Sequence, residues 1–113
     1  MANNFKNAIK TNIAIDSGTY TTVYASPAAK VSIILECDIS NTTGAAIDAS
    51  VTIDDNSTST VAYIVKDAPI PAGGALKVIS GQKIVLEALD SIKAAASAGS
   101  SADCIVSILE DVG

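Results

Sequence analysis

The sequence predicts an all-β fold, an antiparallel β-sandwich of the immunoglobulin-like or jelly-roll-like kind. Three observations support this prediction. Apolar and polar residues alternate with a period of two, turn-forming residues interrupt these runs roughly every 8–12 residues, and Val, Ile and Thr are abundant. Successive side chains of a strand point to opposite faces, so the alternation places one face of each strand on a core.

Nine short strands are predicted, and they form two antiparallel sheets. They lie near residues 8–15, 20–26, 30–40, 46–54, 60–66, 75–79, 82–88, 91–97 and 102–110. Ser80 and Gly81 are interpreted as a turn between two of these strands. Residues 1–7 are predicted to form a flexible N-terminal arm or a short helical turn, and residues 8–113 a single sandwich domain.

The alternation also predicts which side chains face the core. The inward set is Val31, Ile33, Leu35, Cys37, Ile39, Ile47, Ala49, Val51, Ile53, Val61, Tyr63, Val65, Cys104, Val106 and Ile108. Apolar residues also occur in the outward phase, at Ile34, Ile64, Val85, Ile105 and Leu109. Two interpretations of this second set stay open: cover by loops or a sheet edge, and contact with another subunit.

The composition argues against an enzyme. The 113 residues contain no His, so Ser-His-Asp and Cys-His arrangements cannot be built from this chain. The segment Asp54-Asp55-Asn56-Ser57 resembles a calcium loop but has Ser59 where Gly is needed and Val65 where a bidentate Glu is needed. Its carboxylates are interpreted as solvated turn charges. We therefore predict no catalytic residue, no metal site and no cofactor.

Charge and cysteine usage narrow the function further. The chain has seven Lys, no Arg and a net charge of -5, which disfavours binding to nucleic acid. No signal peptide and no apolar run of about 20 residues is visible, so synthesis in a reducing cytosol and no membrane contact are expected. Cys37 and Cys104 are predicted to be buried free thiols, and a disulfide between them stays open. A core without large aromatic residues is thin, which favours a homo-oligomer.

Residues 61–92 carry a family resemblance. Residues 61–76 read VAYIVKDAPIPAGGAL, and residues 81–87 (GQKIVLE) and 90–92 (DSI) follow them. This order resembles small virion structural proteins of tailed bacteriophages, especially those of marine and cyanobacterial hosts. The short arm before Thr21-Thr22-Val23-Tyr24 is similar as well. Relatives often have Gly where Leu89 stands, which affects the tightness of that turn.

The resemblance implies a non-enzymatic virion protein, most simply a capsid decoration (cement) protein that binds the major capsid lattice as a trimer. A tail, neck or baseplate component is one alternative. Another is a receptor- or glycan-binding sandwich, for which Tyr20, Tyr24 and Tyr63 are the available tyrosines. The predicted interface residues are Phe5 and Ile9 on the arm and Ile34, Ile64 and Ile105 in the outward phase.

Overall fold

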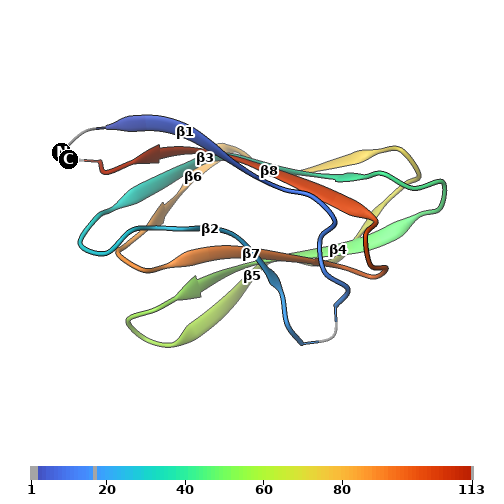
Figure 1. The fold of residues 1–113 in the computed structure, drawn as a ribbon, viewed down its shortest axis with the longest axis horizontal. Helices are drawn as coiled ribbons and strands as arrows, with labels where there is room; N and C mark the ends of the chain where they lie inside the picture. Colours follow the sequence, from blue (N-terminus) through green and yellow to red (C-terminus); the bar gives the residue numbers. More distant parts are fainter. Residues whose placement is uncertain (1–2, 17, 113) are drawn as a thin grey trace.

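The computed structural model describes residues 3–16 and 18–112, and regular structure in this part of the chain is entirely β (Figure 1). Its eight strands are β1 (Asn4–Lys10), β2 (Thr21–Ala25), β3 (Ser32–Asn41), β4 (Ile47–Asp55), β5 (Thr60–Ile70), β6 (Ala75–Leu86), β7 (Ser91–Ala96) and β8 (Ala102–Glu110). No helix long and apolar enough to cross a membrane occurs among the described residues.

The strands form two antiparallel sheets that pack as layers (Figure 1). Sheet A has the order β1-β8-β3-β6, and sheet B has the order β2-β7-β4-β5. Neighbouring strands in both sheets pair in antiparallel fashion. The predicted antiparallel β-sandwich is confirmed.

The core lies between the sheets and is built from aliphatic side chains. Its largest fully buried apolar members are Ile13, Ile34, Ile39, Ile70, Ile79, Leu86, Ile92, Ile108, Val51 and Val106. Each contributes roughly 1.5–3 kcal/mol through removal of apolar area from water. Tyr24, which is 8% exposed, is the one aromatic side chain of the buried core cluster in the described residues.

A β-bulge in β3 reverses the predicted phase of its first half. Ile34 and Glu36 pair with the consecutive residues Ile108 and Ser107 of β8, so Leu35 is an extra residue on β3. Ile34 therefore points into the core and is 0% exposed, which contradicts the prediction that it faces outward. Ile33 points outward instead, although the simple alternation had assigned it to the core.

A second bulge, in β5, turns Tyr63 outward. Val65 and Tyr63 pair with the consecutive residues Val51 and Thr52 of β4, which leaves Ile64 as the extra residue. The prediction that Val61 and Tyr63 face the core is therefore wrong, because they are 56% and 48% exposed. Val65 returns to the inner face and packs against the core.

Strand β6 is continuous where the sequence predicts two strands and a turn. Gly81 has a φ of 92°, which is accessible to glycine at low cost, and the pairing with β3 resumes on both sides of it. Ile34 pairs with Ile84 and Glu36 with Ser80, so the Gly81 segment is a bulge within one strand.

The N-terminal segment is also more ordered than predicted. Residues 4–7 belong to β1, which pairs with β8 from Asn4 opposite Glu110 to Lys10 opposite Cys104. The flexible arm predicted for residues 1–7 is therefore wrong at residues 4–7, while Met1 and Ala2 lie outside the described residues. Residues 8–15, predicted as the first strand, contribute only residues 8–10 to β1.

Candidate functional site

The outer face of sheet A carries a line of apolar side chains that crosses all four of its strands. Phe5 of β1 lies opposite Leu109 of β8, Leu109 lies opposite Ile33 of β3, and Ile33 lies opposite Val85 of β6. Directly opposite side chains in a sheet have Cβ atoms about 4.5–5.5 Å apart, so the four form a contiguous strip. We call Phe5, Leu109, Ile33 and Val85 the apolar row.

The apolar row is accessible to a partner. Phe5 is 77% exposed and Val85 is 57% exposed, while Leu109 and Ile33 are half-buried between them. A second apolar pair, Ile9 opposite Ile105, lies on the same face. Contiguous exposed apolar area on a folded protein marks an interaction surface.

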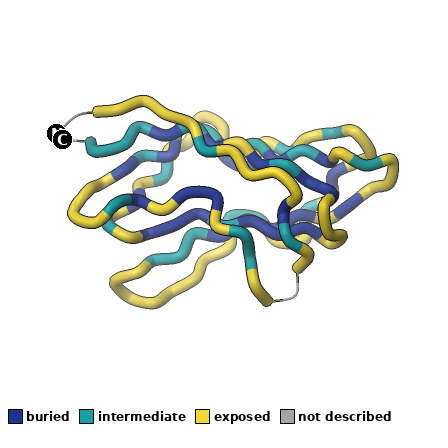
Figure 2. The backbone as a smooth tube through the Cα atoms, in the orientation of Figure 1, coloured by how far each residue is buried: buried dark blue, intermediate teal, exposed yellow. Residues whose placement is uncertain are grey.

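Strand β1 brings the apolar row to the edge of sheet A. It is exposed along most of its length and pairs with β8 on one side only (Figure 2). No described strand pairs with its other edge, so that edge can offer backbone donors and acceptors to another strand. Lys6 and Lys10 alternate with Phe5 and Ile9 along this strand, and charges of this kind limit uncontrolled edge pairing.

The predicted interface residues divide into two groups. Phe5, Ile9 and Ile105 lie exposed on the outer face of sheet A, where the structure brings them together. Ile34 is fully buried, and Ile64 is half-buried and packs against the core. The period-two pattern missed Ile33 because the Leu35 bulge is not visible in it.

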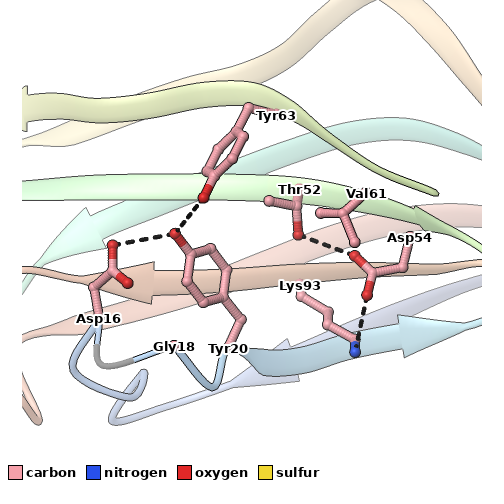
Figure 3. A pocket seen from close by; sticks show the side chains of 8 residues that line it. All are labelled: Asp16, Gly18, Tyr20, Thr52, Asp54, Val61, Tyr63 and Lys93. Atoms are coloured by element: carbon pink, nitrogen blue, oxygen red, sulfur yellow. Dashed lines mark hydrogen bonds and ion pairs between the residues drawn. The ribbon is translucent and has the colours of Figure 1, made fainter. Parts of the chain in front are cut away.

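A pocket of about 230 Å³ opens on sheet B, and two tyrosines form one of its walls (Figure 3). Tyr20 precedes β2 and Tyr63 comes from β5, and their rings meet edge to face with centroids 6.3 Å apart. The Tyr20 hydroxyl donates to Asp16 Oδ2 at 3.1 Å and lies 3.3 Å from the Tyr63 hydroxyl. Because the Tyr20 hydrogen is used on Asp16, Tyr63 donates to Tyr20 and keeps its own oxygen available.

The opposite wall of the pocket is formed by strands β4, β5 and β7 (Figure 3). Lys93 Nζ forms an ion pair with Asp54 Oδ2 at 3.0 Å, and the Thr52 hydroxyl donates to Asp54 Oδ1 at 3.2 Å. Val61 adds an exposed apolar side chain. The pocket therefore combines ring surface, hydroxyls, two carboxylates and one ammonium group.

Burial and hydrogen bonding both act on Tyr20. Burial, followed by the hydrogen bond with Tyr63, raises the pKa of Tyr20 well above its usual value. The hydroxyl is therefore neutral at physiological pH and serves as a hydrogen-bonding group rather than as a base.

Three carboxylates gather at the end of β4. Carboxylate oxygens of Asp55, Glu87 and Asp90 lie within 4.8 Å of one another. Asp55 belongs to the polar segment whose sequence resembles a calcium loop, whereas Glu87 and Asp90 lie more than 30 residues further along the chain. Asp90, however, uses both oxygens: Oδ1 accepts from the backbone N–H of Asn56 at 2.9 Å and Oδ2 from that of Glu87 at 3.0 Å. Its evident role is to hold the two loops together.

The two thiols meet inside sheet A. Cys37 of β3 and Cys104 of β8 are both 0% exposed, and their Sγ atoms are 3.7 Å apart. This separation fits van der Waals contact between free thiols and is well beyond the roughly 2.05 Å of a disulfide. The contact with Cys104, together with burial, raises the pKa of Cys37 strongly.

Comparisons with protein-family models, curated protein sequences and solved structures found no match to this chain. The described residues therefore present two candidate sites, an exposed apolar row on the outer face of sheet A and a polar pocket on sheet B. Sequence reasoning missed the pocket because Asp16, Tyr20, Asp54, Tyr63 and Lys93 share no motif. The rarity of aromatic residues is the one signal that singled out two of them.

Proposed function

We propose that this chain is a non-enzymatic virion structural protein, a capsid decoration protein that docks on the major capsid lattice through the outer face of sheet A. The observation that carries the proposal is the apolar row, with Phe5 77% exposed at one end and Val85 57% exposed at the other. The resemblance of residues 61–92 to small phage virion proteins is the reason for proposing that the partner is a capsid.

The energetics favour a repeated contact over a tight single one. Burying one Val, Leu, Ile or Phe side chain is worth roughly 1.5–3 kcal/mol, and association entropy offsets much of that gain. Such a contact is weak for one copy. Repetition over a regular shell, through a trimer of the chain, raises the effective affinity by multivalency.

Charges beside the apolar row indicate the chemistry of the partner. Glu36 and Asp38 share Lys77, whose Nζ lies 3.9 Å from Glu36 Oε2 and 3.8 Å from Asp38 Oδ1. Hydrogen bonding and repulsion from Asp38 raise the pKa of Glu36. A partner surface with an apolar centre and a basic rim complements this arrangement.

The test measures mass and lattice binding together. Light scattering gives the oligomeric state of the purified chain, and co-sedimentation with empty shells of the encoding virus gives binding. We expect a trimer and saturable binding that the double variant Phe5→Ala, Val85→Ser abolishes. Leu89→Ala is the matched control, because Leu89 is 52% exposed but lies in the loop between β6 and β7.

Two results would overturn the decoration role. One is a monomer that ignores the shells, and the other is shell binding that the double variant leaves unchanged. The copy number in the virion distinguishes a decoration protein from the alternative, a tail, neck or baseplate component. The number of copies of a decoration protein is proportional to that of the major capsid protein, whereas a tail, neck or baseplate component is present in a small fixed number.

A further inference from the structure

The tyrosine-lined pocket lies on sheet B, in the layer opposite the docking face. Its residues come from β4, β5, β7 and the segment before β2, whereas the apolar row belongs entirely to sheet A (Figures 1 and 3). A chain docked through sheet A therefore leaves the pocket free. We infer that this pocket binds one ring of a neutral saccharide.

The side chains of the pocket match both surfaces of a sugar ring. A pyranose has a C–H face that packs on aromatic or aliphatic groups, and Tyr20, Tyr63 and Val61 supply such surface. Its hydroxyls both donate and accept. Asp16 Oδ1 and the Tyr63 oxygen are available acceptors, and Lys93 Nζ has donors beyond the one used on Asp54.

The charge balance favours a neutral ligand over an ion. The pocket carries the carboxylates of Asp16 and Asp54, and Lys93 already neutralises Asp54 at 3.0 Å. Lys66, which does not line the pocket, has its Nζ 5.3 Å from the Tyr63 ring centre, so one of the two faces of that ring already interacts with a cation. Within the pocket, the Lys93 ammonium repels a cationic ligand and the Asp16 carboxylate repels an anionic one.

The size of the pocket limits the ligand to a single ring. Its volume of about 230 Å³ lies below the roughly 300–1,000 Å³ of sites for drug-sized molecules. Because the pocket is open to solvent, the remainder of a longer glycan extends outward without further contacts.

Part of the site is already organised. Thr52 and Ser50, both of strand β4, are 2% and 1% exposed, and Ser50 lies beside Tyr20. The pairing of β4 within sheet B therefore fixes the backbone beneath the pocket. The Tyr63–Tyr20–Asp16 hydrogen bonds fix the wall that faces it. Fixed partners reduce the ordering cost of binding.

Saturation-transfer NMR on the full chain tests the inference. The probes are the methyl α- and β-pyranosides of glucose, galactose, mannose and N-acetylglucosamine, with tetramethylammonium and inorganic phosphate as charged comparisons. We expect transfer to the ring C–H protons of at least one pyranoside. Tyr63→Ala should weaken that binding about tenfold, because it removes an aromatic contact and a hydroxyl.

Two further variants sharpen the outcome. Asp16→Asn should weaken binding while leaving the rings in place. Val85→Ser, on the opposite sheet, should leave it unchanged. The inference is wrong if a folded wild-type chain gives no transfer to any pyranoside, if only a charged probe binds, or if Tyr63→Ala binds as well as wild type. Shell co-sedimentation of Tyr63→Ala reports the docking role separately, since that variant keeps sheet A intact.

Discussion

The Tyr24 hydroxyl donates a 2.6 Å hydrogen bond to Glu110 Oε2 and thereby joins β2 of sheet B to β8 of sheet A. The same hydroxyl lies 3.0 Å from Ser32 Oγ on β3. The bond with Tyr24 lowers the pKa of Glu110, whereas burial, followed by the bond to Glu110, raises the pKa of Tyr24 to about 12. This contact ties the two layers together near one end of the sandwich.

Replacement of Tyr24 by Phe should reduce stability in a pH-dependent way. The lost bond to a carboxylate is worth about 1.5–3 kcal/mol at pH 7. Because the folded pKa of Glu110 is lowered, its contribution is present above the unfolded value of about 4.3 and is lost as pH falls. Urea unfolding at pH 7 and pH 3 should show a smaller wild-type–variant difference at pH 3. Equal differences at both values would contradict this account.

Asn41 is expected to be among the most sensitive polar positions. It is 3% exposed, and its Nδ2 donates to the carbonyls of Ala45 at 2.7 Å and Ile70 at 3.1 Å, while its Oδ1 accepts from the Thr43 N–H at 2.9 Å. Asn41→Ala leaves these buried backbone groups without a hydrogen-bond partner and should lower the free energy of unfolding by about 2–4 kcal/mol. Thermal unfolding measures the loss. Ser40→Ala, at a half-buried position with a 3.5 Å bond, is the milder control.

The two thiols should be protected until the chain unfolds. Both are fully buried, and the raised pKa of Cys37 keeps it protonated, so the reactive thiolate is scarce. A chromogenic disulfide reagent should label neither Cys37 nor Cys104 in the native chain at pH 7.5, and both in urea. Rapid labelling of the native chain would show that β3 and β8 open locally.

Gly81 should resist substitution for conformational reasons alone. Its φ is +92°, and a Cβ placed there would meet no atom within 4 Å. Gly81→Ala should therefore cost about 1–2 kcal/mol through backbone strain rather than through a clash. Gly44→Ala is the matched control, because that glycine also has open space around it but no positive φ. Similar losses in the two variants would refute the explanation.

The sequence predicted the two-sheet architecture better than it predicted which individual side chains point into the core. Cys104, Val106 and Ile108 are all fully buried as the alternation predicts, because β8 pairs with β1 without a bulge. Ile34 and Tyr63 were misassigned because the extra residues Leu35 and Ile64 shift the phase. A bulge is fixed by pairing with a partner strand, so a single strand's pattern does not contain it.

The candidate sites were predictable to different degrees. Phe5 was a natural candidate, because a lone large apolar residue outside the predicted strands has no evident place in the core. The rest of the apolar row depends on strand order and register, which place Leu109 between Phe5 and Ile33. The pocket depends on residues as distant as Asp16 and Lys93, which only the folded chain brings together.

The pairing of β1 with β8 has a consequence for how the protein is made. The edge strand Asn4–Lys10 finds its place only beside Ala102–Glu110, about one hundred residues later in the chain. Sheet A is therefore incomplete until β8 has left the ribosome, and contacts of such long sequence separation form slowly. During translation Phe5 and its neighbours have no sheet to join until synthesis of β8 is finished.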